Sequence, residues 1–429
     1  MIIKVSPVLK LQGSVELPAS KSYSIRAFMI AACGGNSVII APSDCDDALV
    51  ARDIAGFFGA KVVRSGKNSW KVLAAKKIIS QSALNINVGE SGTVLRFILP
   101  LLGVHAQRSI VSGKGTLNGR PNFHLIATLR EMGMDISGSG KKESIPIKIG
   151  PSEIKGGSFN IDGSLSSQFI SALLIACPQI KEDTFLKITG RKIVSSDYIT
   201  MTRQVLKRTG IIIRSKGLRQ YKISGGQRFQ GLKDFHVPSD YGLAAFLMAC
   251  GALVKSKITL NGYFDDQLIQ ADGRILDLLK RMSINFKRTS SAIKMEGPFT
   301  IKGGVFSLKD CPDLVPIMAV LALFAHGKTK LIDIAHARVK ESDRLGDLAR
   351  ELRKVGAHIV DSKNSLTIFP KSQYKKNCLL DPHHDHRLAM AFTVLGLKIP
   401  VQVKDIGCIS KSYPKFLADF KSLGGKAVS

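Results

Sequence analysis

The sequence predicts an α/β protein of two domains, each built from three copies of one supersecondary repeat. Three observations support this fold class: a length of 429 residues, an amphipathic-helix pattern that recurs six times, and an apolar-helix pattern that recurs six times in step with it. A chain of this length exceeds what one hydrophobic core normally serves. Six repeats therefore divide naturally into two groups of three.

The first series combines an amphipathic helix, a small turn residue and a short strand, as in DIAGFFGAKVV and LARELRKVGAHI. The six turn residues are Gly59, Gly133, Gly210, Ser283, Gly356 and Gly424. They lie 68 to 77 residues apart, a spacing typical of repeated supersecondary structure. Glycine is the expected helix stop because it adopts the left-handed conformation without strain.

The second series consists of mostly apolar helices that each open with a residue suited to an N-cap. The expected starts are Ser22, Ser91, Ser166, Asp240, Asp313 and Asp385, which lie 69 to 75 residues apart. Helices that are apolar on nearly every side are buried. Each repeat therefore offers one buried helix, one amphipathic helix and short strands, of which MIIKVSPVLKLQG and SLTIFP are examples.

The charge balance predicts anionic partners. Lysine and arginine outnumber aspartate and glutamate by 62 to 33, which gives a formal net charge of +29. Nucleic acid, a membrane surface and phosphorylated small molecules could all account for this charge. Aromatic residues make up only 7% of the chain, so stacking platforms for single strands are scarce and nucleic acid is disfavoured.

The cysteines and the hydropathy pattern predict a cytoplasmic protein without disulfides or a membrane anchor. Seven scattered cysteines form no CxxC pair, as expected of reduced thiols. No uninterrupted apolar run reaches the length of about 18 residues that a spanning helix needs. The cluster HHDHR matches no standard zinc spacing, so neither a metal nor another cofactor is expected.

The helix starts are the first candidates for a binding site, because a helix N-terminus offers unpaired N–H groups and the positive end of a dipole. In the first three repeats the start carries serine, which suits phosphate or carboxylate binding. In the last three it carries aspartate, which either caps the helix or acts as a base.

A second candidate is the stretch ARVKESDRLG, in which Lys340 and Arg344 are four residues apart. On a helix these two like charges would stack on one face, at a cost of a few tenths of a kcal/mol. Two interpretations remain open at this point, a solvated helix face and a site at which an anion offsets the repulsion.

Seven motifs follow one another along the chain: LPASKSYSIRA, SGTVLR, GRP, SSQF, PDLVP, RVKESDR and DHRLAMAF. Their order and spacing resemble the 5-enolpyruvylshikimate-3-phosphate synthase family over essentially the whole chain. The resemblance implies the enolpyruvyl transferase fold, an inside-out α/β barrel of two domains with three βαβαββ repeats each. It places one domain at 1–20 with 240–429 and the other at 21–239, with the active site in the cleft between them and closure by a hinge.

The resemblance also implies the chemistry, which is transfer of the enolpyruvyl group of phosphoenolpyruvate to the 5-hydroxyl of shikimate 3-phosphate with release of phosphate. Lys21, Asp313 and Glu341 are implied to be catalytic, with Asp313 accepting the hydroxyl proton and Glu341 protonating the methylene carbon. The residues implied to bind shikimate 3-phosphate are Lys21, Ser22, Arg26, Ser166, Ser167, Gln168, Ser195, Tyr198, Asp313 and Lys340. Those implied to bind phosphoenolpyruvate are Lys21, Gly92, Arg120, Gln168, Arg344, Arg387 and Lys411.

Three positions depart from the family pattern. Glu90 and His336 stand where asparagine is usual, and Ala19 replaces a glycine. A carboxylate at position 90 in an anion pocket must be protonated, turned away or paired with a cation. These departures bear on phosphoenolpyruvate affinity more than on the reaction.

Two rival functions remain. The enzyme that moves the same group onto UDP-N-acetylglucosamine shares the fold, but its characteristic loop cysteine is absent from SGKGTLNGRP. An RNA-binding protein or a relative of RNA 3′-phosphate cyclase would explain the charge. We expect small-molecule substrates, no nucleic acid, no membrane and a monomer.

Overall fold

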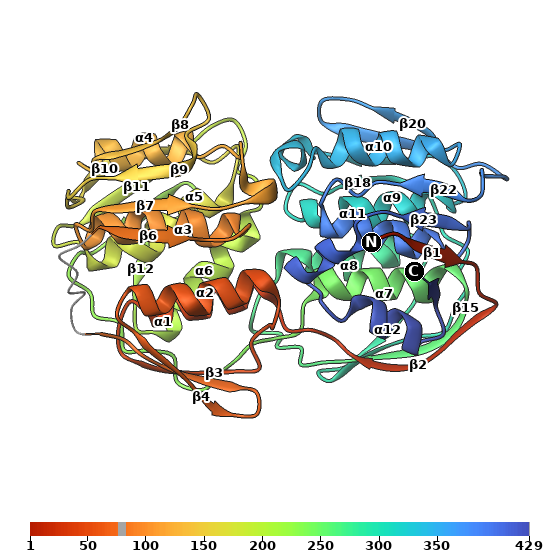
Figure 1. Cartoon of the computed structure of the whole chain (residues 1–429), viewed down its shortest axis with the longest axis horizontal. Coiled ribbons are helices and arrows are strands. Elements are labelled where there is room, and N and C mark those ends of the chain that lie inside the picture. The colour runs from red at the N-terminus through yellow and green to blue at the C-terminus, as the bar shows by residue number, and fades with distance from the viewer. Residues whose placement is uncertain (76–82, 429) are drawn as a thin grey trace. The chain divides into compact units, whose positions relative to one another are not determined.

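The computed structural model describes residues 1–75 and 83–428 (Figure 1). The chain divides into two compact units. One is the continuous unit, Ser20–Val237, and the other is the split unit, which joins Met1–Ala19 to Pro238–Ser429.

Among the described residues, the strands form six four-stranded sheets, three in each unit. In the continuous unit their spatial orders are β14 (Phe235–His236), β3 (Asn36–Ile40), β5 (Ser69–Leu73), β4 (Lys61–Gly66); β6 (Leu84–Asn87), β7 (Ser109–Ser112), β9 (Ser144–Ile149), β8 (Ile136–Ser139); and β10 (Gly157–Asp162), β11 (Thr184–Thr189), β13 (Gln220–Ile223), β12 (Ile213–Lys216). In the split unit they are β2 (Lys10–Glu16), β15 (Lys255–Asn261), β17 (Ala292–Met295), β16 (Lys287–Arg288); β18 (Val305–Ser307), β19 (Thr329–Ile332), β21 (Ser365–Phe369), β20 (His358–Asp361); and β22 (Cys378–Leu380), β23 (Val401–Val403), β1 (Ile3–Ser6), β24 (Lys426–Val428).

All six sheets follow one plan. The first two strands are parallel and the remaining pairs are antiparallel. A parallel pair needs a crossover, which the buried helix supplies in the second, third, fifth and sixth repeats. The last two strands are joined directly as a hairpin in every sheet except that of β1 and β24. This is the predicted βαβαββ repeat.

The helices also fall into the two predicted series. The buried helices are α1 (Lys21–Ala31), α3 (Gly92–Val104), α5 (Ser167–Ala176), α7 (Tyr241–Leu253), α9 (Val315–Leu323) and α11 (His386–Leu395). The amphipathic helices are α2 (Asp46–Phe57), α4 (Phe123–Glu131), α6 (Ser196–Arg208), α8 (Ile275–Arg281), α10 (Arg344–Lys354) and α12 (Phe416–Ser422). Short 3-10 helices are η1 (Gly115–Leu117), η2 (Cys177–Gln179), η3 (Ala271–Arg274), η4 (Pro312–Leu314), η5 (Ala335–Val339) and η6 (Ile406–Lys411).

The cores form around the buried helices. In the continuous unit α3 packs against both α1 and α5, and in the split unit α7, α9 and α11 contact one another. Every residue of α7 and of α9 is buried. Burial of these helices removes a large apolar surface from water, at roughly 25 cal/mol per Å², and this is the main driving force for each unit.

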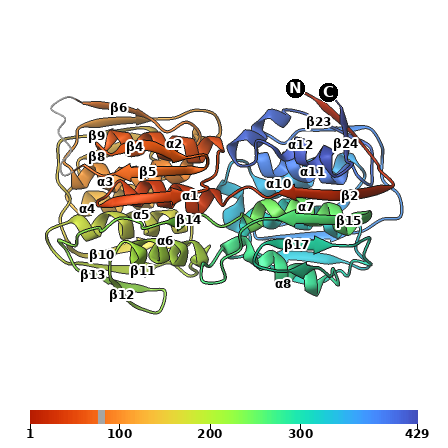
Figure 2. The same cartoon turned by 90° about the horizontal axis from the view of Figure 1, so that it is seen from below.

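Two strands are exchanged between the chain's first and fourth repeats. Strand β2 precedes α1 in the sequence but pairs in parallel with β15 of the split unit, beside which it runs in Figure 2. Strand β14 precedes α7 but pairs with β3 of the continuous unit. Strand β1 lies between β23 and β24, so the N-terminal segment completes two sheets of the split unit.

The six predicted turn residues are confirmed. Each has a positive φ, from +64° at Ser283 to +101° at Gly424. Glycine reaches this left-handed region without strain, and the serine at the fourth position adopts the same conformation.

The predicted helix starts hold in four of six repeats. The side chains of Ser91, Ser166, Asp240 and Asp385 each accept a backbone N–H bond at the start of their helix. In the first repeat Ser20 is the cap, not Ser22. Asp313 caps nothing, because it lies inside η4 and the following proline-containing turn begins α9 without a side-chain cap.

Two further expectations concern the whole chain. The cysteines form no disulfide among the residues that the structure describes. Within the same residues, no helix is both long enough and apolar enough to cross a membrane.

Candidate active site

The predicted site residues fall into two clusters, one in each unit. The continuous-unit cluster comprises Lys21, Ser22, Arg26, Gly92, Arg120, Ser166, Ser167, Gln168, Ser195 and Tyr198. The split-unit cluster comprises Asp313, Lys340, Glu341, Arg344, Arg387 and Lys411.

The starts of α3 and α5 are tied together by side chains. Gln168 Nε2 donates to Thr93 Oγ1 at 2.9 Å, and Arg96 Nη1 donates to Gln168 Oε1. Arg96 also donates through Nε to Asn122 Oδ1 at 3.2 Å and through Nη2 to the Pro121 carbonyl at 3.2 Å. Arg96 was not among the predicted site residues, because its contacts with Gln168, Asn122 and Pro121 join segments far apart in the sequence.

Arg120 lies directly against the start of α3. A Cβ atom at Gly92 would stand 2.9 Å from the Arg120 guanidinium carbon, so only glycine leaves room for this arrangement. Arg120 is 7% exposed. A cation held beside a helix N-terminus is a good site for a phosphate or carboxylate group.

Glu90 is turned toward the neighbouring loop. Its Oε2 accepts hydrogen bonds from the Thr116 backbone N–H at 2.9 Å and from Thr116 Oγ1 at 2.8 Å. A Cβ at Gly115 would stand 2.4 Å from the Glu90 carboxyl carbon, so this contact also requires glycine. The carboxylate thus holds η1 in place. An acid can stand at this position of an anion pocket because it is turned away and bonded to the loop.

Arg26 holds α1 to α6. Its Nε donates to Thr202 Oγ1 at 2.9 Å, its Nη1 to the Ser22 carbonyl at 2.9 Å and its Nη2 to the Tyr198 carbonyl at 3.1 Å. The side chain is 1% exposed, and burial lowers the pKa of its guanidinium to about 10. Arg26 therefore acts as a structural tie here, and Ser22 and Tyr198 are brought next to it through their backbone.

Lys21 is the first residue of α1, and its ammonium lies 3.0 Å from Asp47 Oδ2 at the start of α2. Both side chains are largely buried. Asp47 thereby fixes where the ammonium points. The serines of the cluster lie at helix starts as well: Ser166 and Ser167 open α5, and Ser195 is the left-handed residue before α6.

Arg344 is the centre of the split-unit cluster. It is fully buried and donates to three carboxylates: Asp385 at 2.7 Å, Asp313 at 2.5 Å and Glu341 at 2.7 Å. Burial alone would lower the pKa of this guanidinium, but the carboxylates, Asp385 first, outweigh burial and raise it well above its usual value.

The expected stacking of Lys340 and Arg344 on one helix face is wrong. Asp343 caps α10 by accepting from the Gly346 N–H at 3.0 Å, so the helix begins only at Arg344. Lys340 ends η5, outside the helix. The like charges are therefore separated by a non-helical turn, and carboxylates of the protein balance Arg344.

Asp313 is held between two arginines. Its Oδ1 accepts from Arg344, and its Oδ2 lies 2.9 Å from Arg387 Nη2. Burial opposes ionisation of Asp313, but Arg387, Arg344 and Lys340 outweigh burial and lower its pKa. Asp313 is consequently ionised near neutral pH, as a proton acceptor must be.

Arg387 has a second carboxylate near it. Asp272 Oδ2 lies 3.7 Å from Arg387 Nη2, and a Cβ at Gly242 would stand 2.3 Å from Asp272 Oδ2. Burial raises the pKa of Asp272 to about 7, against the opposing effect of Arg387. Sequence analysis missed Asp272, since nothing in ADGR distinguishes it from a surface residue.

Lys411 and His336 are also largely buried. Lys411 Nζ donates to the His384 carbonyl at 2.8 Å. His336, the replacement for the usual asparagine, is 5% exposed, and burial together with the charge of Lys340 lowers its pKa to about 3. His336 is therefore neutral at physiological pH.

The histidine-rich run does not assemble a metal site. His384 Nδ1 lies 2.5 Å from Asp405 Oδ2, and His383 Nε2 lies 3.2 Å from Glu351 Oε1. Over residues 1–75 and 83–428, no three histidine, cysteine, aspartate or glutamate side chains are grouped so as to hold a metal ion.

Comparisons with known proteins identify the family. The sequence profile described as "EPSP synthase (3-phosphoshikimate 1-carboxyvinyltransferase)" matches residues 5–420. The 3-phosphoshikimate 1-carboxyvinyltransferase of Clostridium beijerinckii is 32% identical over 97% of this chain and 96% of its own length. That of Methanocaldococcus jannaschii is 34% identical over 97% of this chain and 96% of its own length.

Solved structures show the same fold. An EPSP synthase from Acinetobacter baumannii superposes with a TM-score of 0.80 at 23% identity, with each chain covered completely. The enolpyruvyl transferase NikO from Streptomyces tendae superposes with a TM-score of 0.79 at 16% identity, over all of this chain and 98% of its own. The enolpyruvyl transferase fold implied by the resemblance is thus confirmed, and the chain belongs to the EPSP synthase (3-phosphoshikimate 1-carboxyvinyltransferase) family.

Proposed function

We propose that this protein transfers the enolpyruvyl group of phosphoenolpyruvate to the 5-hydroxyl of shikimate 3-phosphate, as a transferase of aromatic amino acid biosynthesis. Family membership supports the reaction. The observation that carries the assignment of residues is Arg344, which bonds both Asp313 and Glu341, the residues with the implied roles of base and acid.

The split-unit cluster supplies the proton transfers. Glu341 protonates the methylene carbon of phosphoenolpyruvate, which places positive charge on the adjacent carbon. The 5-hydroxyl oxygen then forms a bond to that carbon while Asp313 accepts the hydroxyl proton. The Glu341 carboxylate then takes a proton back from the new methyl group as the bond between carbon and the phosphate oxygen breaks, which restores the double bond. The proton held by Asp313 leaves with the phosphate, so atoms and charge balance.

Arg344 links substrate binding to this acid. An arriving substrate carboxylate competes with Glu341 and Asp313 for the guanidinium, because all three are anionic acceptors. Once the substrate occupies Arg344, Glu341 is released to carry a proton. Arg387 and Lys411 add positive charge for the same substrate, and Lys340 lies close enough to act on Asp313 and His336 electrostatically.

The continuous-unit cluster supplies the donors for the phosphates. The serines at the starts of α5 and α6 serve the phosphate of shikimate 3-phosphate, with Lys21, Ser22, Arg26 and Tyr198 around it. Gly92, Arg120 and Gln168 serve phosphoenolpyruvate, and the bond between Gln168 and Thr93 aligns two helix N-termini for that purpose.

The reaction requires both clusters to act on one pair of substrates, with domain limits at 1–20 with 240–429 and at 21–239. Binding of both ligands should therefore draw the two units together about the two chain crossings. Small-angle scattering should show compaction when both substrates are present, and an unchanged radius of gyration would contradict a shared site.

The direct test is release of phosphate from phosphoenolpyruvate and shikimate 3-phosphate without added metal. We expect turnover with this pair and none when UDP-N-acetylglucosamine replaces shikimate 3-phosphate. Folded protein that is inactive with the first pair, or active with the second, would overturn the proposal.

The protein is further proposed to act in the cytoplasm as a monomer, on small-molecule substrates and without a cofactor. Gel filtration with light scattering tests the monomer. Activity that survives exhaustive chelation tests the absence of a metal.

A further inference from the structure

A shallow hollow of about 500 Å³ lies on the sheet of β10, β11, β13 and β12 in the continuous unit. All four strands line it. The hollow lies on the exposed side of the sheet, because residues Thr184, Leu186 and Ile188 of β11 point into the core while Phe185 and Lys187 alternate with them and are exposed. None of these residues belongs to the two clusters described above.

Phe185 stands in the middle of this face. It is 44% exposed, so its ring is open to solvent. The register places it between Ser158 of β10 and Lys222 of β13, and the Lys222 ammonium lies 5.2 Å from the centre of its ring. An aromatic side chain is thus presented to solvent with a cation beside it.

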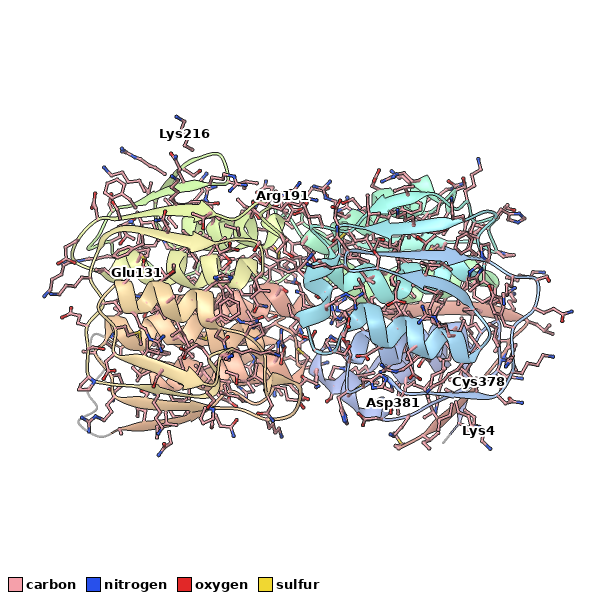
Figure 3. All side chains as sticks on the ribbon, turned by 90° about the horizontal axis from the view of Figure 1, so that it is seen from above. Lys4, Glu131, Arg191, Lys216, Cys378 and Asp381 are labelled. Carbon is pink, nitrogen blue, oxygen red and sulfur yellow. The ribbon has the colours of Figure 1, made fainter. Side chains whose placement is uncertain are left out.

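Basic residues lie near this ring on three strands, β11, β13 and β12. Lys222 is paired in register with Arg214 of β12. Two residues along, Gln220 of β13 is paired with Lys187 of β11 on one side and with Lys216 of β12 on the other. All four of these basic residues are exposed, and Lys216 points outward beyond the end of β12 in Figure 3. Asp183 lies 3.7 Å from Lys222 and offsets part of this charge. These side chains therefore form two rows about 7 Å apart, one with Phe185, Lys222 and Arg214 and the other with Lys187, Gln220 and Lys216.

We propose that this face binds single-stranded nucleic acid. Such a ligand offers a phosphate at each nucleotide for the lysines and the arginine and a base that can stack on Phe185, and this pairing of aromatic platform and basic groove is what sequence-tolerant single-strand binding requires. Low aromatic content disfavours nucleic acid for the chain as a whole, but the fold places one exposed aromatic where four cations meet. The site accounts for part of the +29 charge that two small substrates leave unexplained.

The split unit provides a matched control. The outward positions of its sheet β2, β15, β17 and β16 carry five exposed lysines, Lys10, Lys255, Lys257, Lys287 and Lys294. In the described residues of these four strands, the outward positions hold no aromatic side chain. This lysine face has comparable charge without a stacking platform. Variants on it therefore show how much of any binding comes from positive charge alone.

The test is fluorescence anisotropy of a labelled 12-nucleotide oligouridylate with the full-length protein at about 50 mM salt, where phosphate contacts are little screened. Phe185→Ala should weaken binding at least fivefold, the lower end of what a stacked base contributes. Lys187→Ala with Lys222→Ala should weaken binding and reduce the salt dependence, by about 0.7 in log–log slope for each phosphate that is no longer neutralised. Lys255→Ala with Lys257→Ala, the same change in charge on the lysine face, should change little.

Two competitors complete the experiment. Saturating phosphoenolpyruvate and shikimate 3-phosphate should not displace the oligonucleotide, and all variants should keep the phosphate-release rate of the parent. Inorganic polyphosphate and polyglutamate should compete poorly at equal charge. The proposal is overturned if the parent protein does not bind, if Phe185→Ala binds as the parent does, if the two double variants lose equal affinity, or if polyglutamate binds more tightly, which would point to an acidic protein partner.

Discussion

The two clusters use the same repeated helix start for opposite purposes. In the continuous unit the buried helices α1, α3 and α5 are capped by serine hydroxyls, which leave the positive end of each helix uncompensated. In the split unit α7 and α11 are capped by Asp240 and Asp385. The first arrangement attracts anions, whereas in the second the cap Asp385 also binds the guanidinium of Arg344.

The difference extends to the buried arginines. Arg26 of the continuous unit bonds a hydroxyl and two carbonyls, all neutral, while Arg344 of the split unit bonds three carboxylates. A buried charge network is costly to desolvate and costly to break. The comparison shows that the continuous-unit arginine is held by neutral groups, whereas the split-unit arginine is balanced by carboxylates of the protein.

The largest expected effect comes from breaking the charge network. Arg344→Met leaves Asp385, Asp313 and Glu341 without their shared cation, which should lower the free energy of unfolding by about 3 to 5 kcal/mol and abolish turnover. Arg26→Met leaves only neutral acceptors without a donor, and it should lower the free energy of unfolding by about 1 to 3 kcal/mol. Urea denaturation of both variants measures the difference, and equal losses would show that the two arginines are not distinct in kind.

The next effect is on catalysis and takes one residue from each cluster. Lys21→Ala and Glu341→Gln should each lower the phosphate-release rate at least about a hundredfold, the usual scale for a charge-stabilising or proton-transferring group. Asp47→Asn removes the partner of Lys21 but keeps the ammonium, and should retain most of the rate. Near-normal turnover in either of the first two variants would show that its role is misassigned.

A smaller effect depends on pH and concerns His336. Its folded pKa of about 3 lies below the ordinary value of 6.5, so the unfolded chain takes up a proton first as the pH falls. The stability that the neutral His336 ring contributes is therefore fully present above pH 6.5 and is lost progressively between pH 6.5 and pH 3. His336→Asn lacks this titration. Its free energy of unfolding relative to that of the parent should therefore rise by about 2 kcal/mol between pH 7 and pH 5. A stability difference that does not change over this range would contradict burial of the neutral ring.

The smallest effect probes a single hydroxyl cap. Ser91 accepts from the Val94 N–H at 3.4 Å, so Ser91→Ala should lower the free energy of unfolding by about 1 kcal/mol. Ser91→Thr keeps an oxygen and should lose less. Thermal unfolding of the two variants gives the comparison, and identical midpoints would mean that this cap contributes nothing.

Much of the fold could be predicted because it depends on local pattern. Helix periodicity, turn residues and caps recur six times, so each copy supports the others, and even Ser283 could be assigned as a turn residue from its place in the series. The family motifs then pointed to the residues of both clusters. Their roles stay predictions that the proposed experiments address.

What could not be predicted depends on which side chains meet across the chain. Asp313 resembles an N-cap in the sequence, yet it bonds arginines 31 and 74 residues away. The direction of the Glu90 side chain depends on Thr116 in another loop. Asp272 is buried in the structure, but nothing in the sequence around it indicates this. The error at Lys340 arose from extending a helix through Asp343, whose capping role ends it.

The path of the N-terminal segment has a consequence for synthesis on the ribosome. The continuous unit can fold as soon as β14 emerges, but strands β1 and β2 pair with strands that are made later. Strand β2 must wait for β15, and β1 must wait for β23 and β24, since Val5 pairs with Ala427. Both strands therefore stay unpaired while the whole continuous unit is synthesised, and unpaired strand edges are prone to aggregation during that time.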